Sequence, residues 1–264
     1  RDLRMSRGLG DVYKRQVLAP VVETGWDTVL KEAKKAKIPV IIADRQVKVK
    51  DDSLYTTWVG ADFYQEGQKA CSWMEQYAER NKKKTLNIVH IMGTEGATAQ
   101  IGRTKALEEA AKKNGWNILE QQTGAFTQAK SHEVMEEYLK KYKDIDMVYC
   151  ENDSEALGAI NAIEQAGKKV GTDGIQIISF DATREGLAEV QNGKIAVDVE
   201  CNPDFGKKIE KIIKQLEYKR DVNKEYYIGD KIYTQNKSIS TIEIEKAKWS
   251  VTVVTDKIVK ERVY

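Results

Sequence analysis

Short apolar runs alternate with longer amphipathic stretches along most of the chain. The clearest apolar run is Val-Ile-Ile-Ala at residues 40–43, with Pro39 directly before it. An unbroken apolar run of this length is typical of a strand buried on both faces of a parallel sheet, and a strand tolerates proline at its start. Residues 24–37, which precede it, carry apolar side chains at helical spacing, and residues 17–20 are again apolar. The pattern therefore predicts a strand, a helix and a strand in succession.

The same alternation continues through the middle of the chain. The apolar runs predict strands at residues 54–60, 86–92, 116–122, 146–150, 175–180 and 195–200. The amphipathic stretches predict helices at residues 63–80, 97–114, 128–142, 154–166, 184–192 and 205–218. Strands that alternate with helices indicate an α/β fold with a doubly wound parallel sheet. After residue 225 the pattern changes, and two strand-like segments, 226–233 and 250–254, predict short crossing segments.

The composition of the chain limits the kinds of ligand and partner that it is expected to bind. The 264 residues suggest one large or two smaller domains. Lysine and arginine number 43 against 41 acidic residues, a net charge of +2, which gives no general case for nucleic acid binding. Cys71, Cys150 and Cys201 form no CxxC pair, and only two histidines accompany them, which argues against a zinc site. We expect neither a metal nor a cofactor.

Residues 1–16 differ from the rest of the chain, because they are charged and contain no apolar run. A secretory signal needs an apolar region of about 7–15 residues, so this segment is not one. Its composition resembles translated adapter sequence, and we expect a foreign, unstructured segment. A basic arm that contacts phosphate is the alternative, but charged tails are usually solvated.

Polar side chains follow the predicted strands at their carboxyl ends, beyond which the ligand crevice of an open parallel sheet lies. Candidate ligand-contacting residues follow five of the predicted strands. They are Asp44 and Arg45, Arg103 in the helix after Gly93-Thr94-Glu95-Gly96, Phe126, Asn152, and Asp181. Sugar sites combine such polar groups with an aromatic side chain that covers a ring face. Together these residues predict a sugar site.

Each of these residues also has a structural interpretation. Asn152 and Asp181 could cap the helices that follow them, and Phe126 could belong to the core. Asp44 and Arg45 could form a solvated ion pair. Taken one at a time, the structural interpretations are the commoner ones, and only their coincidence on one edge favours a ligand site.

Several motifs resemble one known family. They are Ile-Pro-Val-Ile-Ile-Ala-Asp-Arg (38–45), Ile-Met-Gly-Thr-Glu-Gly (91–96), Glu-Asn-Asp-Ser-Glu-Ala-Leu-Gly-Ala (151–159) and Ile-Ser-Phe-Asp-Ala-Thr (178–183). With them the chain resembles the periplasmic monosaccharide-binding proteins of ABC transporters, the type I, ribose-binding-like family. Residues 18–33 bring it nearest to the galactofuranose-binding subgroup. The resemblance runs from residue 17 to about residue 217 and weakens thereafter.

The resemblance implies two Rossmann-like lobes, each a doubly wound parallel sheet, joined by a hinge. Residues 17–60 and 202–245 would form the first lobe, residues 61–201 the second, and residues 246–264 a C-terminal tail. A galactofuranose-, galactose- or ribose-like sugar would bind in the cleft between the lobes, which would close around it without catalysis. The contacts carried over by position are Asp44, Arg45, Arg103, Phe126, Asn152 and Asp181. Cys201, at a position where the family often has a polar contact, is a poor hydrogen-bonding substitute.

The resemblance also implies a monomer that delivers its sugar to a membrane permease from a periplasmic or lipid-anchored position. The family's first β–α units and its export signal have no counterpart in this sequence, so we expect an incomplete first lobe that lacks strands flanking residues 38–43. The sugar-effector domain of a LacI-type transcription regulator is an alternative with the same fold. A glycosidase built on Asp44, Glu95 and Asp181 is a second alternative, but the neighbouring Arg45 and Arg103 favour ionised carboxylates over a general acid. His90, in an apolar strand, and His132, on a helix, favour structural roles.

Overall fold

The computed structural model describes residues 15–264, which fall into two compact units. Among the described residues, the first unit comprises residues 15–60 and 204–226, and the second comprises residues 61–203 and 227–264. The expected foreign segment at residues 1–16 lies outside the described residues except for its last two. Gln16 already belongs to a strand, so the expected boundary is one residue late.

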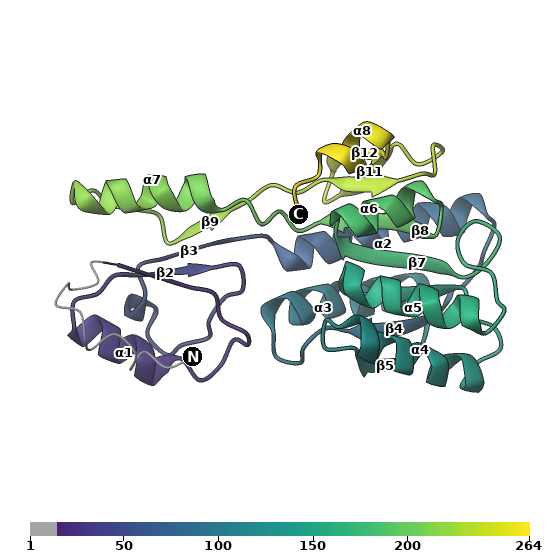
Figure 1. Ribbon diagram of the computed structural model, residues 1–264, viewed down its shortest axis with the longest axis horizontal. Helices are drawn as coiled ribbons and strands as arrows, with labels where there is room; N and C mark the ends of the chain where they lie inside the picture. Colours follow the sequence, from purple (N-terminus) through teal and green to yellow (C-terminus); the bar gives the residue numbers. More distant parts are fainter. Residues whose placement is uncertain (1–14) are drawn as a thin grey trace. The chain divides into compact units, whose positions relative to one another are not determined.

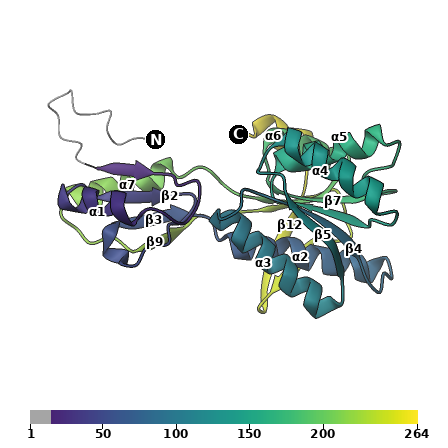
Figure 2. The same ribbon diagram turned by 90° about the horizontal axis from the view of Figure 1, so that it is seen from below.

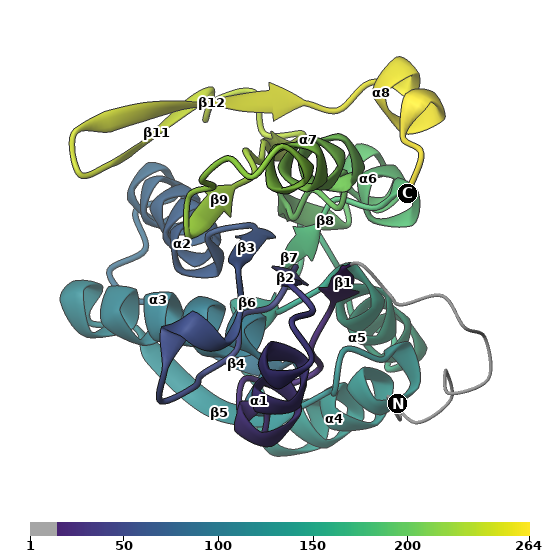
Figure 3. The ribbon, with the colours of Figure 1, turned by 90° about the vertical axis from the view of Figure 1, so that its left-hand side faces the viewer.

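A four-stranded sheet forms the centre of the first unit, in the order β1-β2-β3-β9. Figure 3 shows these strands nearly end on, in the same order across the unit. Helices α1 and α7 lie on opposite sides of the sheet (Figure 1). The bounds are β1 (Gln16–Leu18), α1 (Asp27–Lys35), β2 (Val40–Ala43), the 3-10 turn η2 (Asp52–Leu54), β3 (Thr57–Gly60), α7 (Gly206–Glu217) and β9 (Glu225–Tyr227).

Strand β2 is buried along its whole length, which explains its unbroken apolar run. It pairs in parallel with β1 on one side, in the register Val17 to Ile41, and with β3 on the other, in the register Ile42 to Trp58. The expectation that strands flanking residues 38–43 are lacking was therefore wrong. Both neighbours coincide with apolar runs that predict strands, residues 17–20 for β1 and residues 54–60 for β3.

The second unit contains an eight-stranded sheet in the order β11-β12-β10-β8-β7-β6-β4-β5. Strands β4 to β8 are parallel, as the alternation of strands and helices predicts. Helices α2 and α3 cover one face, and α4, α5 and α6 cover the other (Figure 2). The bounds are α2 (Phe63–Arg80), β4 (Asn87–Met92), α3 (Thr98–Asn114), β5 (Asn117–Thr123), α4 (Gln128–Lys141), β6 (Met147–Cys150), α5 (Asp153–Gln165), β7 (Gln176–Asp181), α6 (Arg184–Gln191), β8 (Ile195–Glu200), β10 (Ile232–Thr234), β11 (Thr241–Ile244), β12 (Ala247–Val253) and α8 (Asp256–Glu261).

The C-terminal segment belongs to the second unit. Strand β10 pairs antiparallel with β8, and β12 pairs in parallel with β10. Residues 204–226 lie in the first unit as expected, but residues 227–245 do not, and residues 246–264 are not a separate tail. The physical reason is that β10 and β12 extend the sheet beyond β8, where Ile232 and Val251 become buried. Among the described residues, no helix is long and apolar enough to cross a membrane.

Candidate functional site

Four of the six predicted site residues lie together at one edge of the second unit. Strands β7, β6, β4 and β5 are neighbours in that order, so the loops after their carboxyl ends are adjacent. Asp181 ends β7, Asn152 follows β6, and Phe126 follows β5. Arg103 reaches Asp181 from helix α3, which follows the glycine loop after β4. We call Arg103, Phe126, Asn152 and Asp181 the second-unit rim.

Arg103 is buried and held in place by several partners. Its Nε and Nη2 atoms donate to Oε2 of Glu66 at 2.9 and 2.7 Å, and Nη1 donates to the backbone oxygen of Glu151. Nη2 also lies 3.6 Å from Oδ1 of Asp181. Burial alone would lower the pKa of Arg103, but the negative charges beside it, Glu66 first among them, raise that pKa well above its usual value. The guanidinium is therefore a permanent cation fixed at the edge of the sheet.

Asp181 is about one-third exposed beside this guanidinium and has a left-handed backbone conformation, with φ of 100°. Non-glycine residues rarely adopt such an angle, and those that do are often found at functional sites. The alternative role of Asp181 as a helix cap is wrong, because Thr183 caps α6. Two buried carboxyl groups hold the turn that follows: Asp198 accepts from the Ala182 amide at 3.1 Å, and Asp153 from the Thr183 amide at 2.7 Å.

Phe126 is half-buried and packs against Ala61, Phe63 and Ala99. Its backbone is also left-handed, with φ of 58°, and its amide donates to Oε1 of Glu155 at 2.8 Å. The ring therefore lies outside the two large hydrophobic clusters that cover the faces of the sheet. It is partly exposed at the rim.

Asn152 caps helix α5 as the structural interpretation predicts. Its Oδ1 atom accepts a hydrogen bond from the backbone amide of Glu155 at 2.9 Å. The cap uses only the oxygen of the side-chain amide. A ligand contact by the amide nitrogen stays a prediction.

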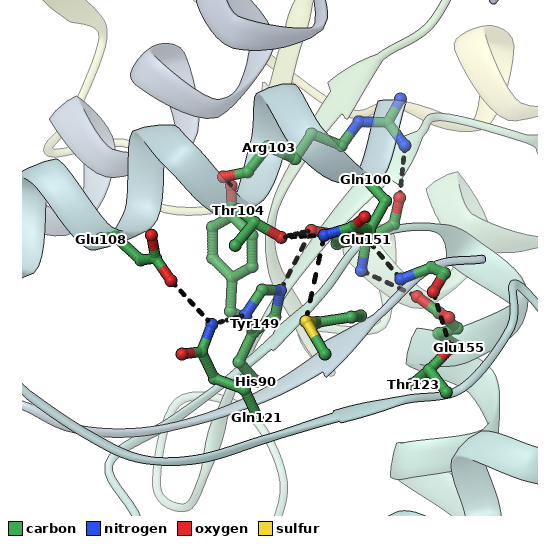
Figure 4. A network of polar contacts seen from close by, with 12 residues as sticks. His90, Gln100, Arg103, Thr104, Glu108, Gln121, Thr123, Tyr149, Glu151 and Glu155 are labelled. Atoms are coloured by element: carbon green, nitrogen blue, oxygen red, sulfur yellow. Dashed lines mark hydrogen bonds and ion pairs between the residues drawn. The ribbon is translucent and has the colours of Figure 1, made fainter. Parts of the chain in front are cut away.

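A buried polar network around Glu151 is joined to Arg103 of the rim (Figure 4). Oε1 of Glu151 lies 3.1 Å from His90 Nε2 and accepts from Thr104 at 2.7 Å, while Oε2 accepts from the Gly93 amide at 2.8 Å. Oε2 of Glu155 accepts from the Glu151 amide at 2.9 Å. This placement gives His90 the structural role expected of it.

The two buried carboxyl groups that contact the rim residues, Glu66 and Glu155, have raised pKa values. Burial, reinforced by the charge of Glu151, raises the pKa of Glu155 to about 8. Burial raises the pKa of Glu66 to about 7, although the Arg103 guanidinium lowers it. Neither Glu66 nor Glu155 is predicted as a site residue by the sequence, and Glu151 is marked only by its place at the end of a strand, next to Asn152 and Asp153. Among residues 15–264, no cluster of acidic, histidine and cysteine side chains is suited to hold a metal ion.

The other two predicted residues end strand β2 in the first unit. Asp44 has a φ of 66°, and its carbonyl oxygen accepts from Trp58 Nε1 at 2.9 Å. Nη1 of Arg45 donates to the Val21 carbonyl at 3.0 Å, and its Nε lies 3.9 Å from Oδ2 of Asp44. The two charged side chains therefore lie together, half-buried, at the carboxyl end of a strand.

Comparisons with known proteins agree with this architecture. A model of the periplasmic binding protein domain matches residues 17–241. The galactofuranose-binding protein YtfQ of Escherichia coli is 42% identical over 193 residues, which cover 71% of this chain and 59% of that protein. The chain thus spans less than two thirds of this curated relative.

Two solved structures are similar as well. A Mycobacterium smegmatis protein in complex with β-D-fucofuranose has a TM-score of 0.80 and 40% identity, covering 84% of this chain and 73% of that one. The binding component of the arabinose ABC transporter from Shewanella sp. ANA-3, bound to α- and β-L-arabinofuranose, has a TM-score of 0.79 and 38% identity, covering 85% and 74%. The family model alone accounts for most of the residues. The chain belongs to the periplasmic binding protein family.

Proposed function

We propose that the chain is the sugar-binding component of an ABC importer and that it takes a monosaccharide in its furanose form. The observation that carries the proposal is the pairing of Arg103 with Asp181, 3.6 Å apart. The guanidinium lies 5.5 Å from the centre of the Phe63 ring, which belongs to the cluster against which the half-buried Phe126 packs. A sugar hydroxyl can accept a hydrogen bond from the guanidinium and donate one to the carboxylate at the same time. The aromatic ring can cover the apolar face of the same sugar.

Fixed geometry at the second-unit rim supports selectivity among sugars. The charged groups of Arg103 and Asp181 and the ring of Phe126 are each held by buried partners, so they cannot easily follow a misplaced hydroxyl. An epimer that leaves a buried polar group unpaired loses much of its binding free energy. The proposal extends to furanoses because the similar chains include binders of galactofuranose, fucofuranose and arabinofuranose.

Asp44 and Arg45 are proposed to supply sugar contacts from the first unit. A permease could then recognise the conformation that sugar binding stabilises. The same relatives support a periplasmic location. A binding role also fits the geometry, because the partly exposed Asp181 lies beside the Arg103 guanidinium, a pair that suits hydrogen bonds to a hydroxyl group.

A calorimetric titration of the whole chain tests this proposal. L-Arabinose, D-galactose and D-ribose would be titrated separately, with L-leucine as a small-molecule control that is not a sugar. Saturable binding of at least one sugar, with no heat from leucine, is the expected result. No saturable binding of any sugar, or binding of leucine alone, would contradict the proposal.

A further inference from the structure

Glu66 is a fully buried carboxyl group whose main partner is the rim residue Arg103. It lies on helix α2, and its Oε2 atom accepts from both Nε and Nη2 of the guanidinium. This contact occupies the side of the guanidinium that usually binds a carboxylate with two parallel hydrogen bonds. An incoming carboxylate or phosphate therefore cannot use that side.

The remaining hydrogen-bonding capacity of Arg103 is small. A guanidinium has five N–H groups, and the contacts with Glu66 and the Glu151 carbonyl use three of them. The two others lie on Nη1 and Nη2, and Nη2 faces Asp181. Single N–H donors next to a carboxylate suit a hydroxyl group, which both accepts and donates.

The charges around Arg103 favour a neutral ligand. Its positive charge is offset by Glu66 at 2.7 Å and by Asp181 at 3.6 Å. Lys69, another buried cation of this unit, is paired with Asp230. An anionic sugar would lose its hydration at a site whose cations already have anionic partners, and burial of an uncompensated charge is costly.

We propose that Glu66 is a positioning residue that orients Arg103 for hydroxyl groups and sets the selectivity of the site for neutral over anionic sugars. The proposal rests on the proposed sugar-binding function. Replacement of Glu66 by glutamine removes the negative charge while it preserves the side chain's shape, and the amide oxygen can still accept from the guanidinium as a neutral acceptor. Arg103 then loses its closest anionic partner, and Asp181 is left to offset its positive charge.

Protonation of Glu66 has a similar effect in the unmodified chain. The groups that act on it are Arg103 on α3, Asp230 before β10 and Cys201 after β8, and its pKa of about 7 arises first from burial. At pH 8 Glu66 is mostly ionised, and at pH 6 it is mostly neutral. Selectivity against anionic sugars should therefore decline as the pH falls from 8 to 6. A sugar carboxyl group with a pKa of about 4 stays ionised throughout this range.

The experiment compares D-galactose with D-galacturonate, which differ in the charge at one carbon. Calorimetric dissociation constants are measured at pH 8 for the unmodified chain, for Glu66→Gln, and for Glu79→Gln as a control on an exposed position of the same helix. We expect Glu66→Gln to weaken galactose binding about tenfold or more and to lower the preference for galactose over galacturonate about tenfold. Glu79→Gln should change neither quantity.

The pH series separates positioning from a merely structural role. In the unmodified chain the preference for galactose should fall between pH 8 and pH 6, and in Glu66→Gln it should be nearly constant. An unchanged preference in Glu66→Gln at pH 8 would overturn the inference. If Glu66→Gln does not fold, the test uses the unmodified chain alone. A preference for galactose over galacturonate that stays constant between pH 8 and pH 6 would then overturn the inference. The inference is also overturned if the unmodified chain binds neither D-galactose nor D-galacturonate. If L-arabinose and D-ribose do not bind either, the proposed sugar-binding function is contradicted as well.

Discussion

The ring of Phe126 lies directly against the backbone of Gly93. A Cβ atom added at Gly93 would sit 2.0 Å from Cζ of the Phe126 ring, a distance that no two non-bonded carbon atoms adopt. Glycine is required here for close approach, since its backbone angle is not in the left-handed region. The loop after β4 and the loop after β5 therefore fit together only because position 93 has no side chain.

Replacement of Gly93 by alanine should displace the Phe126 ring. The clash involves the far end of a side chain, so we expect a modest loss in the free energy of unfolding, about 1 kcal/mol. Sugar affinity should fall much more, by about as much as in Phe126→Ala. Chemical denaturation and calorimetry on the same samples would measure both effects. Gly206→Ala, where an added Cβ meets open space, serves as the control. It should leave sugar affinity unchanged and should not lower stability, since alanine is favoured over glycine in a helix. Equal sugar affinity in Gly93→Ala and the unmodified chain would show that the ring position does not matter for binding.

Glu155 should be necessary for the backbone geometry of Phe126. Its two oxygens accept from the Phe126 and Glu151 amides, and in Glu155→Gln an NH2 group would face one of these donors. The unpaired amide should cost about 1–3 kcal/mol of unfolding free energy. Glu164→Gln alters an exposed ion pair on the same helix and should cost less than about 1 kcal/mol. A denaturation experiment that finds equal effects for the two variants would argue against this role of Glu155.

Stability should depend on pH through the same group. The pKa of Glu155 is raised from 4.5 to about 8 in the folded chain, which means that the folded state binds the proton more tightly than the unfolded state. The stabilisation is fully present below the unfolded pKa and is lost as the pH rises through the folded value. Glu66 acts in the same direction, with a pKa of about 7. Urea denaturation should therefore show the free energy of unfolding falling between about pH 5 and pH 8. A smaller fall is expected in Glu155→Gln, and a rise over this range in the unmodified chain would refute the assignment.

Arg262 should anchor the C-terminal segment to the second unit. The guanidinium forms a largely buried ion pair with Glu200 and donates to the Tyr233 hydroxyl at 2.7 Å. Arg262→Met would leave Glu200 buried without its cation, for which we expect a loss of about 3–5 kcal/mol. Lys260→Met, on an exposed position two residues earlier, is the control. If thermal unfolding of the two variants is alike, residues 246–264 behave as a detachable tail, as the sequence alone suggested.

Much of the fold follows from the apolar pattern, because a parallel sheet covered on both faces needs continuous apolar strands. Strand β2 and the parallel strands β4 to β8 carry this signal clearly. The region 226–233 was expected to be one strand-like segment, but it contains the end of β9, which pairs with β3, and the start of β10, which pairs with β8. Its residues are half-polar, so no pattern marks the point where the chain changes unit.

Only the candidate site residues at the strand ends could be predicted from the sequence, and the buried residues that hold them could not. Arg103, Phe126, Asn152 and Asp181 stand at strand ends or beside a motif, and these positions are visible in the sequence. The buried carboxyl groups of Glu66 and Glu155 lie on helices among other acidic residues. Which acidic residues of a helix face inward depends on tertiary packing, which a single sequence does not reveal.

Arg45 should contribute to binding with little effect on folding. Its guanidinium donates to a loop carbonyl and lies near Asp44 at the end of β2. As a charge-assisted contact to a sugar, it should be worth about 2 kcal/mol of binding free energy, so Arg45→Ala should weaken binding by about thirtyfold. Lys31→Ala, on an exposed position of α1, is the matched control. Unchanged calorimetric affinity in Arg45→Ala would remove this residue from the proposed site.

The central claim is that the second-unit rim binds sugar through the Arg103–Asp181 pair, and the most direct test is the affinity of Asp181→Asn. L-Arabinose would be titrated calorimetrically into the unmodified chain, into Asp181→Asn, and into Asp144→Asn as an exposed control. We predict saturable binding to the unmodified chain and to Asp144→Asn. We predict that Asp181→Asn binds L-arabinose at least about tenfold more weakly and that its unfolding temperature is nearly unchanged. Saturable binding of equal affinity in all three proteins would contradict the account.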